Sequence, residues 1–283
     1  MPKVAIVADT NCGLTRKEAE KLGVYLVPMP FSINYKTYHE GVDITEKELF
    51  ELMESGAEVR TSQPSPADVC DIWDKALETH DEVVYIPMSS ALSSTCASAV
   101  ALAADYDGKV QVVDNRRLSV THYSSILDAI KLMEYGTDAE EIKKILEKHA
   151  LEAPIYVTVN NLEHLKKGGR ITPAAAGIAT ILNLKPVLYY HGDKLDSYKK
   201  VRGMEKAKLA MIDAIKKEIE ETYKYTNYRL FVAYSGDKKE AEKWHKQFAH
   251  EFPGREVIMH HLPLSLCCHV GDGVLGAAVA KML

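Results

Sequence analysis

Three segments rich in hydroxyl side chains give the first chemical signal in the sequence. They are DTNCGLT (9–15), RTSQPSP (60–66) and PMSSALSSTCASA (87–99), each at the passage from an expected strand to an expected helix. In open α/β sheets the ligand crevice lies outside the carboxyl ends of the strands. Helix N-termini there present free backbone N–H groups and a partial positive charge, which favours an anion. Each segment alone also fits an ordinary turn and helix cap, but their recurrence in one half of the chain favours a binding site.

The segment RTSQPSP divides into a helix start and a remainder. Ser65 is a typical N-cap residue, and Pro66 suits the first helical position. Thr61, Ser62 and Gln63 precede the cap, and a helix start does not require all three. We therefore expect the hydroxyls before the cap to be available to a ligand, whereas helix propensity gives Gln63 no role.

The absence of phosphate-binding patterns narrows the class of anion. Neither GxxxxGK[ST] nor GxGxxG occurs, and LKKGGRI (165–171) is basic and rich in glycine but has the wrong order for a phosphate loop. Neutral hydroxyls with few cations nearby suit a single carboxylate better than a polyphosphate. The sequence therefore favours a carboxylate over a nucleotide.

A hydrolytic serine is the alternative chemistry for the same segments. Ser93 or Ser90 would be the nucleophile, with a histidine as its base. The nucleophile-elbow pattern GxSxG does not occur. Serine in a helix start is usually structural, so binding is favoured over hydrolysis.

The stretch HHLPLSLCCH (260–269) collects histidines and cysteines without the spacing of a metal site. Neighbours on a strand project to opposite faces, so His260–His261 or Cys267–Cys268 would not readily bind one ion as a pair. We expect no metal. His269 differs, because it stands between an apolar run and GDG. It is either a buried donor facing the crevice or a core histidine whose hydrogen bonds are satisfied.

Composition excludes several classes of protein. The 283 residues carry a net charge of −5 and a pI of about 6.1, which disfavours nucleic acid as a partner. The segment MPKVAIVADT (1–10) indicates a first strand rather than a signal peptide. Apolar runs such as AAAGIATILNL (174–184) are too short to span a bilayer, so we expect no integral membrane segment. Five cysteines without framework spacing predict reduced thiols and a cytoplasmic location.

The elements that must position these segments alternate between strand and helix patterns, which predicts an α/β fold with a mainly parallel sheet. A change of pattern at LEAPIYVTVN suggests two α/β domains, 1–152 and 153–283, and a Gly-Asp turn at 192–193 predicts a hairpin in the second. The expected strands are 3–9, 24–33, 82–88, 109–114, 154–160, 185–190, 194–202, 228–235 and 256–262. The expected helices are 15–22, 45–55, 66–79, 93–104, 119–134, 138–150, 161–167, 172–182, 203–222, 237–250 and 274–283.

Taken together, these segments resemble the DegV family of bacterial fatty-acid-binding proteins, which includes the binding subunits of fatty acid kinase. TSQPSP (61–66) resembles the family signature, and PMSSALSSTCASA is similar to its S-S-x-L-S-x-T segment. LKKGGRI followed by LKPVL resembles motifs of the family's second half, and HVGDG (269–273) resembles its H-x-G-P-G. The resemblance runs from residue 3 to the C-terminus.

The resemblance implies a fold and a ligand. The first domain would have a mainly parallel, Rossmann-like sheet and the second a mixed sheet, with an acyl-chain pocket between or within them. The carboxylate of a long-chain fatty acid would be held by the hydroxyls of Thr61 and Ser93, with His269 nearby and Ser62 contributing locally. The protein would be a carrier without catalytic activity and without a cofactor.

The resemblance also implies a partner. In family members that work with a kinase, basic residues near the tunnel mouth help to present the carboxylate for phosphorylation, and Arg170 and Arg202 match such positions. A separate ATP-dependent kinase would then form an acyl phosphate. Solvated surface cations are the alternative interpretation of both arginines.

Three positions depart from the family pattern. The family usually has glycine where Ala91 and Ser94 stand, and proline where Asp272 stands. A side chain at the first two positions would keep the backbone farther from a ligand, and a carboxylate at the third would mildly repel an anion.

Two other functions stay open at this point. One is a serine-dependent lipid hydrolase that uses Ser93 and His269. The other is a regulatory module that senses a small carboxylate and needs no long apolar tunnel.

Overall fold

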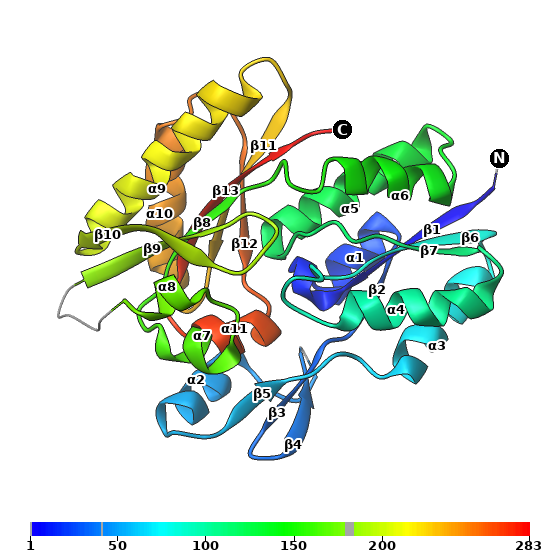
Figure 1. Ribbon diagram of the computed structural model, residues 1–283, viewed down its shortest axis with the longest axis horizontal. Coiled ribbons are helices and arrows are strands. Elements are labelled where there is room, and N and C mark those ends of the chain that lie inside the picture. Colours follow the sequence, from blue (N-terminus) through cyan, green and yellow to red (C-terminus); the bar gives the residue numbers. More distant parts are fainter. Residues whose placement is uncertain (1, 41, 179–183) are drawn as a thin grey trace.

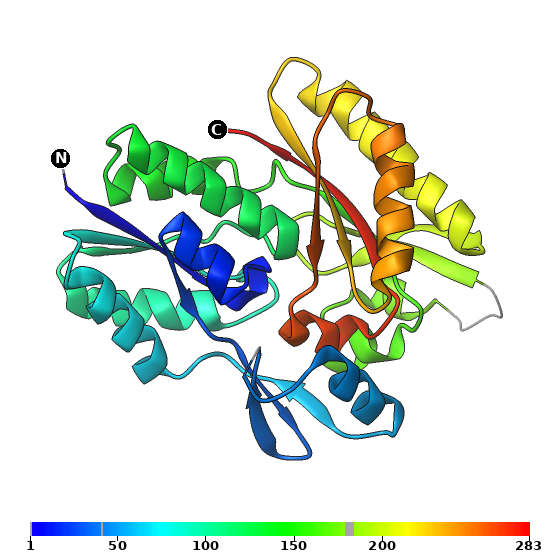
Figure 2. The same ribbon diagram turned by 180° about the vertical axis from the view of Figure 1, so that it is seen from behind.

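The computed structural model describes residues 2–40, 42–178 and 184–283, and three sheets organise these ranges (Figures 1 and 2). A four-stranded sheet has the order β2-β1-β6-β7, a six-stranded sheet the order β10-β9-β8-β13-β11-β12, and a three-stranded sheet the order β4-β3-β5. The fold is α/β, with a parallel first sheet and a mixed second one, as predicted. Within these ranges, the helices fall short of the length and apolar character that a bilayer span requires.

The four-stranded sheet is covered on both faces, which explains why its strands are nearly continuous apolar runs. Ala5 and Val7 of β1 face α3 and α4, whereas Val4, Ile6 and Ala8 face α1, α5 and α6. The strands are β1 (Val4–Asp9), β2 (Val24–Val27), β6 (Glu82–Ile86) and β7 (Val110–Val112). The helices are α1 (Arg16–Leu22), α3 (Pro66–Leu77), α4 (Thr95–Ala103), α5 (Ser119–Glu134) and α6 (Ala139–Lys148), with the short 3₁₀ helices η1 (Thr10–Cys12) and η2 (Ala104–Tyr106).

The six-stranded sheet is the second layer of the molecule, and α9 and α10 cover its outer face (Figure 1). Its strands are β8 (Ile155–Thr158), β9 (Leu184–Tyr190), β10 (Asp196–Arg202), β11 (Tyr228–Tyr234), β12 (Val257–His261) and β13 (Leu275–Lys281). The outer helices are α9 (Met204–Glu218), continued by a π-helical turn (Ile219–Tyr223), and α10 (Lys238–His250). The inner face carries α5 and the short helices α7 (Glu163–Gly168), α8 (Pro173–Ala176) and α11 (Leu264–Val270). The antiparallel pairing of β9 with β10 confirms the predicted hairpin, and Gly192 and Asp193 lie in its connection, residues 191–195.

The predicted helix at 274–283 is wrong, because residues 275–281 form β13. This strand lies between β8 and β11 at the centre of the sheet and is antiparallel to both. Leu275 and Val279 enter the core beneath α9 and α10, whereas Ala278 enters the core on the inner face. A strand buried on both faces is a continuous apolar run, which periodicity alone does not distinguish from a buried helix.

The run at 24–33, predicted as one strand, forms two strands in different sheets. β2 ends at Val27, and β3 (Pro30–Ile33) pairs with β4 (Lys36–His39) and β5 (Val59–Thr61). Pro28 and Pro30 break the run, because proline lacks the N–H that a sheet ladder requires. The predictions did not include β4 and β5, and the latter has only three residues.

The three-stranded sheet packs beneath the six-stranded sheet together with α2 (Glu46–Glu54). Phe31 and Leu49 belong to the same buried cluster as Leu262 and Cys267. The segment 30–61 therefore adds to the core of the second half of the molecule. The predicted boundary between residues 152 and 153 stays a prediction, although all strands of the four-stranded sheet precede it and all strands of the six-stranded sheet follow it.

Helix starts follow their sequence signals closely. Ser65 is the N-cap of α3, as predicted, and both Thr45 with Glu48 and Ser65 with Asp68 form reciprocal capping boxes. The predicted helix at 172–182 is shorter, because α8 ends at Ala176 before a turn at Gly177. Residues 179–182 of that prediction lie outside the described residues.

Candidate functional site

A cavity of about 230 Å³ lies between the four-stranded and six-stranded sheets. One wall is built by residues that follow parallel strands, namely Asn11 after β1, Met29 after β2 and Met88 after β6. The opposite wall is the inner face of the six-stranded sheet, with Val157 and Gly276. A single water requires about 10–15 Å³ of such space, so the cavity has room for an organic ligand.

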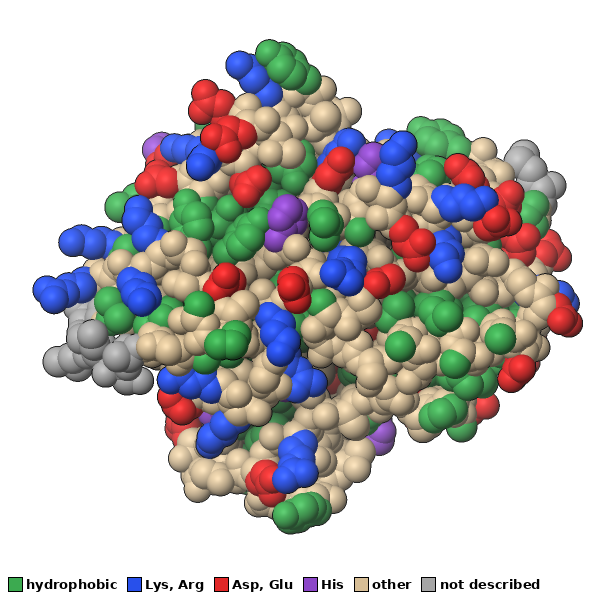
Figure 3. Space-filling view, in the orientation of Figure 1, with side chains coloured by type: hydrophobic (Ala, Val, Ile, Leu, Met, Phe, Trp, Pro, Cys, Tyr) green, Lys and Arg blue, Asp and Glu red, His purple; other side chains and the backbone are tan. Residues whose placement is uncertain are grey.

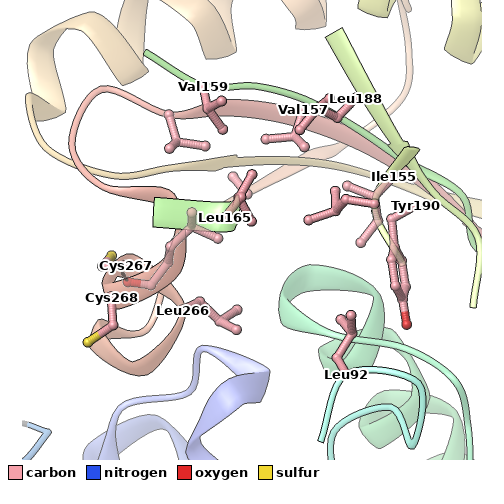
Figure 4. Packing of buried hydrophobic residues seen from close by; sticks show 14 of the residues in the cluster. Leu92, Ile155, Val157, Val159, Leu165, Leu188, Tyr190, Leu266, Cys267 and Cys268 are labelled. Atoms are coloured by element: carbon pink, nitrogen blue, oxygen red, sulfur yellow. Dashed lines mark hydrogen bonds between the residues drawn. The ribbon is translucent and has the colours of Figure 1, made fainter. Parts of the chain in front are cut away.

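The walls of this cavity are mainly apolar. In Figure 4, Leu165 and Leu266 lie on one side of an open space, and Leu92, Ile155 and Tyr190 lie on the other. These residues come from α7, α11, the turn before α4, β8 and β9, so distant parts of the chain meet at one space. An apolar ligand in this space would contact both halves of the molecule.

Helix α11 presents one face to the cavity. Ser265, Leu266 and His269 line it, at spacings that place them on one side of a helix. Cys267 and Cys268 are on this helix, which the sequence did not predict, and they point away from the space (Figure 4). Burial keeps the pKa of both thiols well above its usual value, so they are inert packing residues.

Thr61 and His269 form the polar end of the cavity. Thr61 Oγ1 lies 2.9 Å from His269 Nε2, because β5 ends beside α11. Burial, followed by the charge of Arg170 and by His164, lowers the pKa of His269 to about 4. The imidazole is therefore neutral at pH 7 and keeps one N–H donor.

The paired glycines of LKKGGRI allow a close approach to His269. A Cβ on Gly168 would lie 2.5 Å from His269 Nδ1, which is closer than side-chain atoms pack. Gly169 ends α7 in the left-handed region, at φ 69°, where other residues are strained. The GG pair therefore lets the chain end a helix while passing directly over the histidine.

Ser93 and Ser62 also line the cavity, with different side-chain environments. Ser93 Oγ lies 2.8 Å from Thr95 Oγ1 and accepts the Thr95 N–H at 3.2 Å, so this hydroxyl is bonded to the first residue of α4. Ser62 is exposed at the cavity edge, and its backbone N–H donates to the Pro30 carbonyl at 3.3 Å. The hydroxyl of Ser93 is held in place by the helix that follows it.

The site of a serine hydrolase requires a nucleophile within hydrogen-bond reach of its base. The side-chain hydrogen bonds of Ser93 go to Thr95, and the hydrogen bond of His269 goes to Thr61. The two residues share the cavity without forming a nucleophile–base pair. The geometry therefore gives no support to hydrolysis.

Gln63 links two of the hydroxyl-rich segments. Its Oε1 accepts a hydrogen bond from Ser94 Oγ at 2.7 Å and another from Ser98 Oγ at 3.1 Å. The side chain thus ties the segment that carries Thr61 to the first turn of α4, beside Ser93. Helix propensity gave Gln63 no role, and these hydrogen bonds supply one. They also account for the side chain of Ser94, which donates to Gln63.

The two predicted arginines occupy different places. Arg170 lines the cavity, its Nε donates to the Leu92 carbonyl at 3.3 Å, and its Nη1 donates to the Gly168 carbonyl. Arg202 ends β10, is exposed, and is not among the described residues that line the cavity. The structure thus brings together Thr61, Ser62, Ser93, His269 and Arg170.

The other departures from the family pattern lie at the edge of the site or outside it. Ala91 donates its backbone N–H to Ser89 Oγ at 3.2 Å and does not line the cavity. Asp272 packs against Gly236, where a Cβ would collide with its carboxylate, and it too is absent from the described lining. The carboxylate of Asp272 is therefore not placed to repel an anion in the cavity.

The histidines before α11 have separate neighbours. His261 Nε2 lies 2.6 Å from Glu46 Oε1, whereas the ring of His260 packs on Tyr123 at 4.5 Å between centroids. In the ranges that the structure covers, groups of three histidine, cysteine or acidic side chains with a metal-binding arrangement do not occur. His260 and His261 act in packing and in anchoring α2.

Asn11, Ser119 and Ser265, which were not predicted from the sequence, also contribute polar groups to the cavity wall. Ser265 Oγ donates to Asn11 Oδ1 at 2.7 Å. Two signals could have indicated these residues: Asn11 lies within the first hydroxyl-rich segment, and Ser265 stands one helical turn before His269. Ser119 carries no such signal in the sequence. It starts α5 with an unusual φ of 50°.

Comparison with known proteins gives one consistent result. The family model named DegV matches residues 3–282. A DegV domain-containing protein of Deinococcus radiodurans is 30% identical over 281 residues, which cover 99% of both chains. A solved structure from Thermus thermophilus, described as fatty acid binding of a DegV family protein, is 31% identical and superposes with a TM-score of 0.90 over 99% of both chains. A stearic-acid-binding protein from Eubacterium ventriosum is 26% identical, with a TM-score of 0.88 over 99% of this chain and 98% of that one.

Proposed function

The chain belongs to the DegV family, and from this premise we propose that it binds a long-chain fatty acid in the cavity between its two larger sheets. The observation that carries the proposal is a mainly apolar cavity with one polar end, where Thr61 meets His269 beside Ser93 and Arg170. A fatty acid has the same division, with an apolar tail and one ionisable head. The fatty-acid-binding proteins that share this fold add support.

The tail supplies most of the binding free energy in this proposal. A buried CH₂ contributes roughly 0.8 kcal/mol, so a tail of about fourteen carbons would contribute on the order of 10 kcal/mol before entropy costs. Leu92, Ile155, Val157, Leu165 and Leu266 would take up this surface. Short acids would therefore bind far more weakly than long ones, which distinguishes the carrier from a sensor of small carboxylates.

The polar end orients the head group. Hydrogen bonds to a charged group contribute about 1.5–3 kcal/mol each, whereas removing water from a carboxylate costs several kcal/mol. Thr61, Ser93 and neutral His269 would offset this cost and fix the direction of the chain. Arg170, which already reaches the cavity, would supply positive charge close to the head.

A separate ATP-dependent kinase would act on the bound carboxylate to form an acyl phosphate, while this chain contributes no catalytic group. Lys and Arg side chains gather on the face of the molecule over α7 and the junction of the two halves (Figure 3), close to the polar end of the cavity. Positive charge at this place would attract an acidic surface of a partner. Arg202 would extend this surface away from the cavity. The five free cysteines are compatible with action in the cytoplasm.

The test is denaturing extraction of freshly purified protein followed by mass spectrometry. We expect long-chain fatty acid in stoichiometric amount, and delipidated protein should bind added fatty acid with a single site. Protein that carries no lipid and also fails to bind added fatty acid after delipidation would refute the proposal.

A further inference from the structure

The cavity contains a second polar position, distinct from the pair of Thr61 and His269. Ser265 Oγ donates to Asn11 Oδ1 at 2.7 Å, and both residues line the cavity. Asn11 is 1% exposed and Ser265 is 3% exposed, so this hydrogen bond is fully removed from solvent. The two residues belong to η1 and α11, which the fold brings together at the cavity wall.

Hydrogen-bonding capacity at this position is left over. Among the described residues, Asn11 Nδ2 and the hydroxyl of Ser119 have no hydrogen-bond partner, although both atoms are buried. Ser119 lines the same cavity, and α5, which it starts, packs against η1. A buried polar group without a partner destabilises the folded protein. Both residues line the same cavity, so a polar occupant would complete their hydrogen bonds.

The second polar position is separate from the first along the cavity. Ser265 and His269 are four residues apart on α11, on the same face of the helix and about 6 Å apart along its axis. Leu266 lies on the same wall between them in sequence, and it lines the cavity too. A chain whose carboxylate lies at Thr61 and His269 would pass Asn11 and Ser265 before it reaches its methyl end.

The chemistry of the two side chains selects the occupant. Asn11 Nδ2 offers N–H donors, and Ser265 Oγ, whose proton is given to Asn11, offers acceptor lone pairs. If the amide oxygen and nitrogen of Asn11 were exchanged, its N–H would donate to Ser265 Oγ and its Oδ1 would be the free acceptor. In either orientation, one amide atom of Asn11 remains available. A hydroxyl group both donates and accepts, and it therefore satisfies this position better than a methylene or an ester carbonyl.

We propose that the position formed by Asn11, Ser265 and Ser119 binds a hydroxyl group on the acyl chain, so that the cavity selects hydroxylated fatty acids with the hydroxyl nearer the carboxyl end than the methyl end. The proposal rests on fatty acid binding and names the ligand class more narrowly. The carboxylate contacts stay at Thr61 and His269, and the second position adds selectivity among acids of equal length.

The experiment compares stearic acid with positional isomers of hydroxystearic acid on delipidated protein. We expect one isomer, or two adjacent ones, to bind about tenfold tighter than isomers with the hydroxyl elsewhere, a difference of about 1.4 kcal/mol. Asn11→Leu and Ser265→Ala should each abolish this preference while stearic acid still binds. The readout is the ratio of the affinity for the preferred hydroxystearic acid to the affinity for stearic acid, because a purely structural defect would weaken both acids together.

Asn115→Leu is the matched control. Asn115 is also fully buried with an Nδ2 that has no partner in the described part of the chain, but it does not line the cavity. This variant should keep the preference of the unchanged protein. If stearic acid binds but the protein shows no preference among the hydroxylated isomers, the inference is overturned while fatty acid binding stays intact. That result would indicate that water fills the position. Failure of all the acids to bind would refute the proposed function itself.

Discussion

Thr61 Oγ1 and His269 Nε2 lie 2.9 Å apart, although 208 residues separate them along the chain. The first residue ends an edge strand of the small sheet, and the second lies in the last turn of α11. Because burial and Arg170 hold the pKa of His269 at about 4, the contact joins two neutral groups at pH 7. Each can turn one hydrogen bond toward an entering carboxylate without first breaking an ion pair.

The double substitution Thr61→Ala with Ser93→Ala should weaken binding of a fatty acid more than binding of its methyl ester. The acid loses charge-assisted hydrogen bonds of about 1.5–3 kcal/mol each. The ester has no charged head group and therefore has no such hydrogen bonds to lose. Titration of both ligands with the unchanged and the substituted protein gives the comparison. Ser55→Ala with Thr79→Ala, two exposed hydroxyls away from the cavity, is the control. Equal losses for acid and ester would remove Thr61 and Ser93 from the head-group site.

Gln63→Ala should loosen the segment that carries Thr61. The substitution removes the hydrogen bonds from Ser94 and Ser98, each of which contributes about 0.5–1.5 kcal/mol. Hydrogen exchange of the amides at 61–63 should accelerate by about tenfold, which corresponds to about 1.4 kcal/mol of local stability. Gln247→Ala on α10 is the matched control. Unchanged exchange at 61–63 would show that Gln63 does not hold this segment.

Gly276→Ile should shorten the fatty acids that the protein accepts. Gly276 lines the cavity on β13, and a Cβ there meets the nearest atoms at 3.5 Å or more, so the backbone tolerates a side chain. The isoleucine would project into the cavity and exclude part of the tail. Affinity for the longest acids should fall at least tenfold, which corresponds to about two methylenes at roughly 0.8 kcal/mol each. A uniform loss for long and short acids would place the chain elsewhere in the cavity.

His269 should make the ligand-free protein less stable in mild acid. Its pKa falls from 6.5 in the unfolded chain to about 4 in the folded one, because burial and Arg170 disfavour the imidazolium. Between these values the unfolded state binds the proton and the folded state does not, so stability falls as the pH drops from about 6.5 to 4. The slope from this residue approaches about 1.4 kcal/mol per pH unit.

Chemical denaturation of the unchanged protein and of His269→Gln across this pH range measures that contribution. His122, which is buried, and His260, which is half-buried, also have pKa values lowered by desolvation, and they keep their share of the slope in both proteins. The substituted protein should therefore show a shallower loss of stability. Identical slopes would mean that His269 is already solvated in solution.

Features set by neighbouring residues were predictable from the sequence. The capping boxes at Thr45 and Ser65 need only residues three positions apart, and the alternation of β1, α1, β6 and α5 reflects local burial patterns. β13 was not predictable in this way, because its strand conformation depends on β8 and β11 on either side. β5 has three residues and is defined by its pairing with β3.

The same distinction applies to the residues of the site: some were predictable from the sequence, whereas others depend on contacts that the fold creates. Residue type indicated the hydroxyl-rich segments and drew attention to His269, and the family resemblance then pointed to Thr61, Ser93 and His269 as partners of a carboxylate. The contact of Asn11 with Ser265 spans 254 residues, and Gln63 meets Ser94 only because α3 packs against α4. Such contacts follow from the assembled fold, so residue spacing carries no record of them.

The central place of β13 has a consequence for the biosynthesis of the protein. β8, β9 and β10 on one side, and β11 and β12 on the other, are joined through this strand alone in the order of the sheet. Until residues 275–281 leave the ribosome, β8 and β11 each have an unpaired strand edge. The wall that carries Val274 and Gly276 is completed only then. Exposed strand edges are prone to pair with other chains, so we expect the nascent chain to be most prone to aggregation before that moment.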